Sequence, residues 1–413
     1  MASKHLRILI IGLNYAPEMV GVAVYTSGMA EALAGMGHKV RVIGGQPYYP
    51  QWRVFPGFPR VLWSRSVERG VDVFRCPHYV PAKPTGPRRI IHHATFALSA
   101  FFPAIWSALT HRPDIVIAIA PSIIAAPVAP LAARLSGGKA WLHVQDLELE
   151  AAVATGLVRE GPAARLGRQF ERWLLRSFDR VTSISGKMCE RLIDKGVEPH
   201  KIAEVRNWAA VDEIRPLERA SSYRERWSIE TPHVALYSGN IANKQGVEVI
   251  VKAARRLRDR HDLTFVICGE GPNRAQLEET ARGLTNIRFF DLQPSEQLEE
   301  LLGLATVHLL PQLASAADLV LPSKLGNMMA SGIPVIATAA PGSGLAAEVE
   351  GCGLVVAPGD ADAMARAIEQ LLDGRHLREI SGKMGLARAR SRFSKAAAMA
   401  SLMDTRPQIR HRS

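Results

Sequence analysis

A serine and a lysine interrupt an apolar stretch in the second half of the chain. The segment "VLPSKLGNMMASGIPVIAT" (320–338) places Pro322, Ser323 and Lys324 just before residues with helical spacing. A helix N-terminus presents unpaired N–H groups and the positive end of the helix dipole, and both favour anions. The pattern therefore predicts that an anionic group binds here, with Ser323 also capping the helix.

Two further turns in this half carry residues suited to a nucleotide. In "SGNIANKQG" (238–246), Gly239 and Gly246 let the backbone approach a ligand, and Lys244 can reach a diphosphate as a point charge. In "CGEGP" (268–272), a base or a ribose could lie against Gly269, Glu270 and Gly271. Each turn alone also fits an ordinary loop after a strand. Three such turns at strand ends in one domain favour a nucleotide ligand.

The first half offers a second set of polar residues after apolar runs. In "YAPEMVGVAVY" (15–25), Glu18 lies in the turn and Gly21 leads into a helix. The GxGxxG spacing of dinucleotide-binding proteins is missing here, which disfavours NAD and FAD. In "HVQDLELE" (143–150), a His or Asp at the end of a strand could take a proton from an acceptor hydroxyl; the candidates are His143, Gln145 and Asp146. A plain polar loop is the alternative.

Alternating strand and helix patterns must position these residues. Short apolar runs separated by helical segments are typical of parallel α/β sheets. The first series is 6–13, 39–45, 114–120, 140–146 and 180–185, and the second is 233–240, 263–271, 286–291, 306–311, 334–338 and 353–358. The sequence therefore predicts two Rossmann-like, doubly wound domains facing across a cleft, with ligands at the carboxyl ends of the strands.

A charged stretch between two prolines, about 213–232, is the expected joint between the domains. We therefore predict an N-terminal domain over 1–212 and a C-terminal domain over 213–390. The remaining residues, 391–413, form a basic tail that packs back or is partly disordered. The chain has 413 residues, a length that fits two domains.

Charge is concentrated in the first half. Residues 1–212 hold 26 basic and 16 acidic residues, whereas 213–413 hold 25 and 23. This balance favours a nucleic acid, a membrane surface or a phosphorylated substrate as partner, unless the charge serves solubility alone. Aromatic residues make up only 6% of the chain, so no stacking platform for nucleic acid is expected. The four cysteines lie far apart without a CxxC pair, which predicts neither a metal site nor disulfides.

Residues 90–110 contain no charged side chain, and the segment is long enough to span a bilayer. Two histidines, several hydroxyl residues and Pro103 make it a poor membrane span. A buried domain helix and a helix with one face on a membrane are the other two interpretations. Arg88 and Arg89 precede the segment and fit the last of these.

The segments "GNIANKQG", "VICGEGPNRAQLE" and "VLPSKLGNMMASGIPVIAT", in this order and at these separations, resemble the retaining GT-B nucleotide-sugar glycosyltransferases of family four. "SISGKM" and "EVRNW" before the joint resemble the same family. The variants "HVQDLELEAA" and "NKQG" are most similar to its colanic acid biosynthesis branch, with fucosyl- and fucosaminyltransferases nearby. The resemblance covers roughly residues 6–390.

The resemblance implies a hexosyl transfer with retention, usually without a metal and without a cofactor. The donor is a GDP- or UDP-sugar bound by the C-terminal domain, and the acceptor is a sugar on a polyprenyl diphosphate. Lys244 and Lys324 hold the diphosphate, while His143 and Asp146 act at the acceptor. Such an enzyme is cytoplasmic and peripheral on the anionic inner face of the plasma membrane. The further substrate contacts implied are Glu18, Gly21, Gln145, Gly239, Asn240, Gly269, Glu270, Gly271, Asp318, Leu321, Pro322, Ser323 and Asn327.

The chain departs from the family pattern at two places. Two glutamates eight residues apart are replaced by Leu319 and Asn327, so Asn327 offers the ribose a hydrogen bond but no charge, and neighbouring Asp318 could serve near the sugar hydroxyls. The family histidine in the N-terminal loop aligns with Gln145 rather than His143.

Two alternative functions remain. One is a GT-B sugar-nucleotide epimerase, and the other is a non-catalytic sugar-nucleotide-binding or membrane-associated partner in polysaccharide export.

Overall fold

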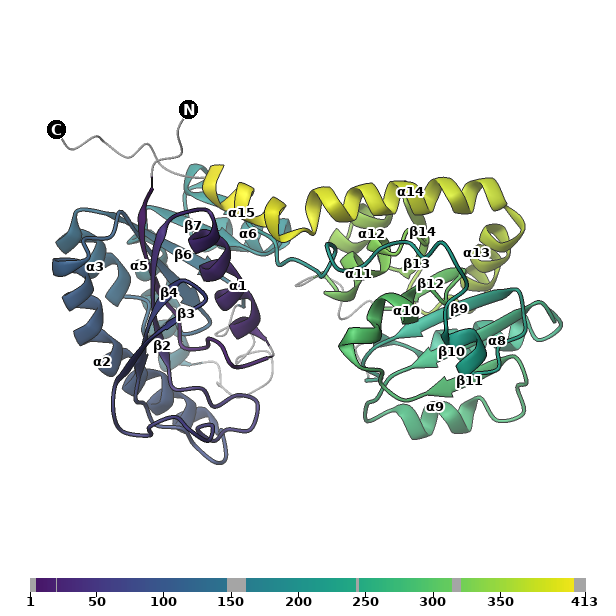
Figure 1. Cartoon of the computed structure of the whole chain (residues 1–413), viewed down its shortest axis with the longest axis horizontal. Coiled ribbons are helices and arrows are strands. Elements are labelled where there is room, and N and C mark those ends of the chain that lie inside the picture. The colour runs from purple at the N-terminus through teal and green to yellow at the C-terminus, as the bar shows by residue number, and fades with distance from the viewer. Residues whose placement is uncertain (1–4, 20, 147–160, 243–244, 314–320, 405–413) are drawn as a thin grey trace. The chain divides into compact units, whose positions relative to one another are not determined.

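The computed structural model describes residues 5–19, 21–146, 161–242, 245–313 and 321–404 (Figure 1). The chain divides into two compact units, Met1–Val205 with Met399–Ser413, and Arg206–Ala398. The predicted boundary between 212 and 213 therefore lies a few residues beyond this division. Most of the predicted basic tail is grouped with the first unit.

An eight-stranded sheet forms the centre of the first unit, in the order β3-β4-β2-β1-β5-β6-β7-β8. Its neighbouring strands pair in parallel, except that β3 pairs with β4 in antiparallel fashion at the edge. Parallel strands covered on both faces are apolar throughout, which is why their sequences are apolar runs. The strands are β1 (Arg7–Ile11), β2 (Lys39–Gly45), β3 (Ser64–Glu68), β4 (Val71–Cys76), β5 (Ile115–Ala120), β6 (Lys139–Val144), β7 (Arg180–Ser183) and β8 (Ile202–Glu204).

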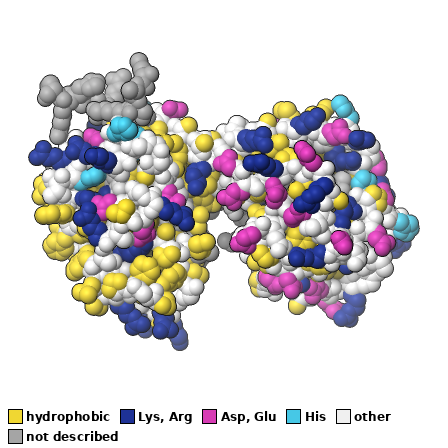
Figure 2. Space-filling model, in the orientation of Figure 1, with side chains coloured by type: hydrophobic (Ala, Val, Ile, Leu, Met, Phe, Trp, Pro, Cys, Tyr) yellow, Lys and Arg dark blue, Asp and Glu magenta, His cyan; other side chains and the backbone are white. Residues whose placement is uncertain are grey.

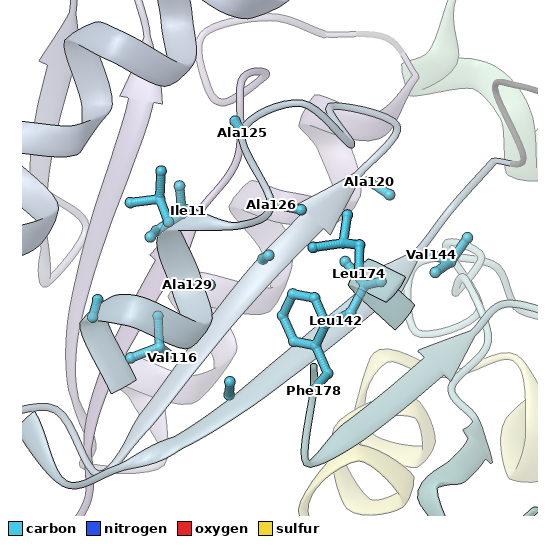
Figure 3. Close-up of a cluster of buried hydrophobic side chains, with 14 of the residues drawn as sticks. Ile11, Val116, Ala120, Ala125, Ala126, Ala129, Leu142, Val144, Leu174 and Phe178 are labelled. Atoms are coloured by element: carbon cyan, nitrogen blue, oxygen red, sulfur yellow. The ribbon is translucent and has the colours of Figure 1, made fainter. Parts of the chain in front are cut away.

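One hydrophobic cluster fills the space between this sheet and its helices. Figure 3 shows Val116 and Leu142 from neighbouring strands beside Leu174 and Phe178 from the end of a helix and its loop. Alanines such as Ala129 let the helices approach the sheet closely. The helices of this unit are α1 (Val22–Gly35), α2 (Gly86–Thr110), α3 (Val128–Ser136), α5 (Pro162–Arg176) and α6 (Gly186–Asp194).

The second unit is built around a six-stranded parallel sheet in the order β11-β10-β9-β12-β13-β14. All of the strand segments predicted for this half are confirmed. The strands are β9 (His233–Ser238), β10 (Leu263–Cys268), β11 (Ile287–Phe290), β12 (Val307–Leu310), β13 (Val335–Thr338) and β14 (Gly353–Val356). The helices are α7 (Tyr223–Arg226), α8 (Glu248–Arg256), α9 (Arg274–Thr280), α10 (Leu298–Leu302), α11 (Lys324–Ala330), α12 (Gly344–Val349), α13 (Ala361–Asp373) and α14 (Arg375–Arg392).

Helix α2 corresponds to the uncharged segment of the sequence. Among the described residues it is the one helix long and apolar enough to cross a membrane, a test that a core helix also passes. One face of it, including Phe96, Ala100 and Ala104, is buried in the core of the first unit. The opposite face is exposed along Ile90, Ile91, Leu98, Phe101, Phe102, Trp106 and Leu109. One face of α2 therefore belongs to the core of the first unit, and its other face is an apolar surface.

Three strands and one helix were not foreseen. Strand β3 is the edge strand and is largely exposed, while β4 beside it alternates between buried and half-buried residues, so neither forms an apolar run. Strand β8 is only three residues long. In the predicted tail, residues Lys395–Asp404 form helix α15, and the hydroxyl of Ser401 in it donates a hydrogen bond to the Glu204 carbonyl at 2.8 Å.

A buried carboxylate joins the beginning and the end of the second unit. Glu348 in α12 is 3% exposed, and its Oε1 lies 2.7 Å from Arg206 Nη1 and 2.9 Å from Arg392 Nη2. Arg206 begins the unit and Arg392 ends α14. Because a buried charge is tolerated only when it is paired, removing this carboxylate leaves two guanidinium groups without their shared partner.

We predict that Glu348→Ala lowers the free energy of unfolding by about 3–5 kcal/mol, the usual result of breaking a buried ion pair from one side. The matched control is Glu350→Ala, an exposed glutamate two residues away whose loss costs less than about 0.5 kcal/mol. Urea unfolding of the full chain measures both. Equal midpoints for the two variants would contradict the role given to Glu348.

Candidate functional site

A pocket of about 390 Å³ opens at the carboxyl ends of β9 and β10 in the second unit. Ser238, Gly239 and Asn240 line it from the first of the predicted turns, and Cys268 lines it from the end of β10. Its other walls are Gln245, Leu292, Gln293, Leu298, Leu301, Pro322, Ser323 and Lys324. The structure thus brings residues of all three predicted turns to one pocket, because parallel strands end at the same edge of a sheet.

The Lys324 ammonium is held in the wall of this pocket. Its Nζ lies 4.1 Å from the centroid of the Tyr237 ring and 3.3 Å from the Ser238 carbonyl oxygen, to which it donates. The Tyr237 hydroxyl donates to the Asn240 carbonyl at 2.5 Å, so the ring is fixed in turn. Burial lowers the pKa of Lys324 to about 8, so the amine is still mostly protonated at neutral pH. An anion entering the pocket meets a preorganised positive charge.

Glycine is required in the turns around this lysine. A Cβ on Gly239 would lie 2.7 Å from Lys324 Nζ, so any side chain there would displace the ammonium. A Cβ on Gly269 would lie 1.8 Å from the Gly239 carbonyl oxygen, and one on Gly271 would lie 2.1 Å from the Ile241 carbonyl oxygen. The "CGEGP" turn therefore packs directly behind the Gly239 turn. Its glycines serve this backbone contact, whereas a substrate contact by Gly269 or Gly271 stays a prediction.

The turn before α11 differs from its prediction in one detail. No hydrogen bond from the exposed Ser323 side chain caps α11 among the described residues, because Ser323 itself has helical backbone angles. The capping role expected for Ser323 is thus wrong, and its hydroxyl lines the pocket instead. Pro322 lines the same pocket, and Leu321 beside it packs in the core below.

Two residues expected at the donor have protein partners. Asn327 Oδ1 accepts a hydrogen bond from the Ala210 N–H at 2.8 Å, which ties α11 to the segment that begins the unit. Glu270 pairs with Arg274 at 2.6 Å while keeping an exposed side chain. The ribose contact predicted for Asn327 remains a prediction. Lys244, Asp318 and Leu319 lie outside the described residues.

In the first unit, Glu18 supports a loop. It is 3% exposed, its Oε1 accepts from the N–H groups of Tyr48 and Tyr49 at 2.8 and 2.9 Å, and its Oε2 accepts from Asn14 Nδ2 at 2.9 Å. Burial raises the pKa of this carboxyl. Gly21 precedes α1 with a φ of 63°, a conformation that favours glycine. The pattern gives Glu18 a positioning role for the 46–50 loop.

The predicted acceptor residues follow β6. His143 is 1% exposed, with its Nδ1 2.9 Å from Thr182 Oγ1 and its Nε2 3.1 Å from Gln145 Nε2. Burial lowers the pKa of His143 to about 4, so the ring is neutral at physiological pH. Gln145 is 7% exposed, and Asp146 beside it is exposed. This geometry favours His143 as the residue that orients Gln145, and Asp146 as the one that faces solvent.

Sequence reasoning missed a cluster of histidines and aromatic rings next to Glu18. His78 and His92 lie 4.9 Å apart by ring centroid, and His92 lies 4.7 Å from Tyr48 and 5.4 Å from Trp52. Burial lowers the pKa of His78 to about 4 and that of His92 to about 3, so neither carries charge at neutral pH. The cluster follows β2 and β4 and includes the first turns of α2, and the wide spacing of its members hid it in the sequence.

Metal ligands do not gather in the described part of the chain, where no three His, Cys, Asp or Glu side chains are placed to hold an ion. The four cysteines are buried and unpaired with one another. Burial raises the pKa of Cys76 to about 12 and that of Cys268 to about 11, so these thiols stay protonated.

Comparison with known sequences matches both units. Residues 232–374 match the family described as glycosyl transferases group 1, and residues 20–208 match the glycosyl transferase 4-like domain. The chain is 39% identical over 378 residues to the putative colanic acid biosynthesis glycosyl transferase WcaI of Escherichia coli, covering 89% of this chain and 92% of that protein.

Solved structures with the same fold include sucrose-phosphate synthase from Thermosynechococcus elongatus, with a TM-score of 0.68, 18% identity, and coverage of 96% of this chain and 98% of that one. HepE from Anabaena, in complex with UDP and glucose, aligns with a TM-score of 0.63 and 15% identity, over 97% of this chain and 99% of that one. At these identities the likeness concerns the fold, and it confirms the predicted GT-B architecture.

We predict that Gly269→Ala destabilises the protein by about 3 kcal/mol or more, because its Cβ meets the Gly239 carbonyl. Gly283→Ala is the matched control: this glycine also has a positive φ, 84°, but no atom within 4 Å of its Cβ. There the cost is that of the backbone conformation alone, about 1–2 kcal/mol. Thermal and urea unfolding measure the difference, and equal losses would show that the two turns do not pack as described.

Proposed function

The chain belongs to the same glycosyltransferase family as its colanic acid biosynthesis relative, and from that premise we propose that it transfers a hexose from a nucleotide-diphosphate sugar to an exopolysaccharide acceptor. The transfer proceeds with retention at the anomeric carbon. The observation that carries this proposal is the Lys324 ammonium, held against the Tyr237 ring and the Gly239 backbone in a pocket at the strand ends.

In the reaction, the bond between the anomeric carbon and the diphosphate oxygen breaks, and a bond to the acceptor hydroxyl oxygen forms. The leaving diphosphate gains negative charge, which a fixed cation in a partly dry site stabilises. Lys324 supplies that cation, and Ser323 can donate its hydroxyl proton to a phosphate oxygen. The resemblance adds Lys244 from the 238–246 turn on the other side of the diphosphate.

The nucleoside is placed against other walls of the same pocket. Leu292, Leu298 and Leu301 offer apolar surface to a base, while Gln293 offers an amide. Gln293 Nε2 donates to the Asp291 carbonyl at 2.7 Å, which orients that amide. HepE, which shares the fold, was seen with UDP and glucose, and the resemblance to the colanic acid branch implies GDP-fucose. We propose a GDP- or UDP-sugar donor, fucose or a related hexose being the transferred sugar.

The acceptor side belongs to the first unit. Asp146, exposed after β6, is the proposed group that takes the acceptor proton, with Gln145 oriented by His143. The family acceptor is a sugar on a polyprenyl diphosphate, which would place the enzyme at the cytoplasmic face of the membrane. The basic first half of the chain and the exposed apolar face of α2 support a peripheral association of this kind.

We predict that Lys324→Ala lowers kcat by about 10²–10³, the usual loss when one preorganised charge-stabilising contact is removed. Lys252→Ala is the matched control, since Lys252 is an exposed lysine on α8 of the same unit. Turnover is measured as release of GDP or UDP from a panel of nucleotide sugars, with thermal unfolding to confirm the fold. Turnover within a factor of two of the wild type in Lys324→Ala would remove the diphosphate assignment.

We also predict that the protein sediments with phosphatidylglycerol vesicles at low salt and is released by high salt. Arg88→Glu combined with Arg89→Glu should weaken this binding, because each basic residue near an anionic surface contributes about 1 kcal/mol. Equal partition onto neutral and anionic vesicles would refute the electrostatic account. Resistance to salt and to alkaline washing would instead indicate that α2 spans the membrane.

A further inference from the structure

One pocket of the first unit lies at the amino ends of its strands, away from every residue assigned above. It measures about 650 Å³ and opens where β6 and β7 begin. Its rim carries six basic side chains against one carboxylate, Asp179. The basic residues are Arg134, Lys139, Arg176, Arg180, His200 and Lys201. A concave site with this charge balance suits a phosphate group.

Partners within the protein neutralise only part of this charge. Asp179 pairs with Lys139 at 2.8 Å, and Glu198, just outside the pocket, pairs with Lys201 at 3.0 Å and lies 3.4 Å from His200. Arg176 donates a long hydrogen bond of 3.5 Å to the Gly196 carbonyl, and its charge helps to lower the pKa of Glu198 without a close ion pair among the described residues. Arg134 has no side-chain partner among the described residues. Two guanidinium groups on neighbouring helices are therefore available to an anion.

Helix dipoles explain part of the pattern. Arg134 and Arg176 stand in the last turns of α3 and α5, where a cation favours the helix end. Lys139 and Arg180 come instead from the first residues of strands, and Lys201 comes from a short 3₁₀ turn. Helix stability alone gives no reason for these three to converge on the same pocket.

A second, apolar groove continues from this pocket. It measures about 460 Å³ and shares Pro130, Arg134, Arg176 and Ser177 with the basic pocket. Its remaining walls are Pro127, Leu131 and Trp173. Trp173 is 60% exposed and Leu131 is 41% exposed, so both present apolar surface to the outside. One continuous groove between α3 and α5 is therefore cationic at one end and apolar at the other.

The surface around the groove is unusually apolar. Helix α3 packs against α2 in one layer over the sheet, and the outer sides of α2, α3 and α5 expose large apolar residues. Figure 2 shows hydrophobic side chains gathered on the lower part of the first unit, where Figure 1 draws α2. The exposed apolar residues of these helices include Leu98, Phe102, Trp106, Leu109, Leu131, Leu135, Leu166, Phe170 and Trp173. Patches of this kind mark contact with membranes or partners.

We propose that the groove between α3 and α5 binds an anionic phospholipid of the membrane surface. The lipid phosphate contacts Arg134 and Arg176, and the upper part of an acyl chain lies against Leu131 and Trp173. The combination of cationic and apolar ends fits an amphiphile better than a soluble anion, which needs no apolar wall. This inference rests on the proposed peripheral association and assigns it to a defined surface, distinct from Arg88 and Arg89.

The test is cosedimentation of the full chain with phosphatidylglycerol vesicles at about 0.1 M salt, where exposed charges are screened beyond ~10 Å. Arg134→Glu with Arg176→Glu should lower the partition coefficient at least about tenfold. Leu131→Ser with Trp173→Ser should lower it severalfold and make the remaining binding more sensitive to salt. The matched controls on the second unit are Lys252→Glu with Lys383→Glu, and Ile380→Ser with Met384→Ser, all at exposed positions; they should stay within about twofold.

Several outcomes would overturn the proposal. If the Arg134→Glu/Arg176→Glu variant binds vesicles as well as the wild type, or if Lys252→Glu/Lys383→Glu loses as much binding, the groove is not the lipid site. Displacement from vesicles by inorganic phosphate at matched ionic strength would show that the site takes a soluble anion instead. None of these variants changes a residue of the pocket that contains Lys324. Nucleotide release from the donor, measured in solution, therefore tests the proposed transferase activity separately from lipid binding.

Discussion

The position of one ammonium group determines the arrangement of the pocket at the carboxyl ends of β9 and β10. Lys324 is wedged between the Tyr237 ring, the Ser238 carbonyl and the bare backbone of Gly239. A charge buried to this extent needs close partners, and the ring quadrupole and the carbonyl supply them without neutralising it. The Gly239 turn must then stay free of side chains, and the Gly269 turn must pack behind it just as closely. The glycines of two turns thus follow from one lysine.

The two units solve different physical problems. The second unit has a nearly balanced charge, and its pocket concentrates a single cation at the strand ends. The first unit carries the excess of basic residues and an apolar outer layer on α2, α3 and α5, while its own strand ends hold neutral histidines. The proposed transfer from a soluble donor to a lipid-linked acceptor calls for both kinds of surface. The division of charge along the chain is consistent with that proposal.

Much of this fold could be predicted, because strands covered on both faces must be apolar throughout; β5 and β9 are clear cases. Strands β3 and β4 were not predicted, because β3 is an exposed edge strand and β4 beside it contains charged residues, so neither is an apolar run. Lys324 and the Gly239 turn could be found from turn chemistry and helical spacing. The inward positions of Glu18 and His143, and the contact of Asn327 with Ala210, could not, since they depend on loops distant in sequence. The same holds for His78 and His92, which only the folded chain brings together.

The most direct measurement of the central claim is the pH dependence of GDP and UDP affinity, by calorimetry, for the wild type and for Lys324→Met. The pKa of Lys324 is lowered by burial to about 8, so the amine is charged below that pH and neutral above it. The nucleotide affinity of the wild type should fall as pH rises through 8, by up to about tenfold per pH unit. Lys324→Met should bind more weakly than the wild type at low pH and should not show this fall, so the two affinities should converge at high pH. Parallel profiles for the two proteins would contradict the assignment of the diphosphate to Lys324.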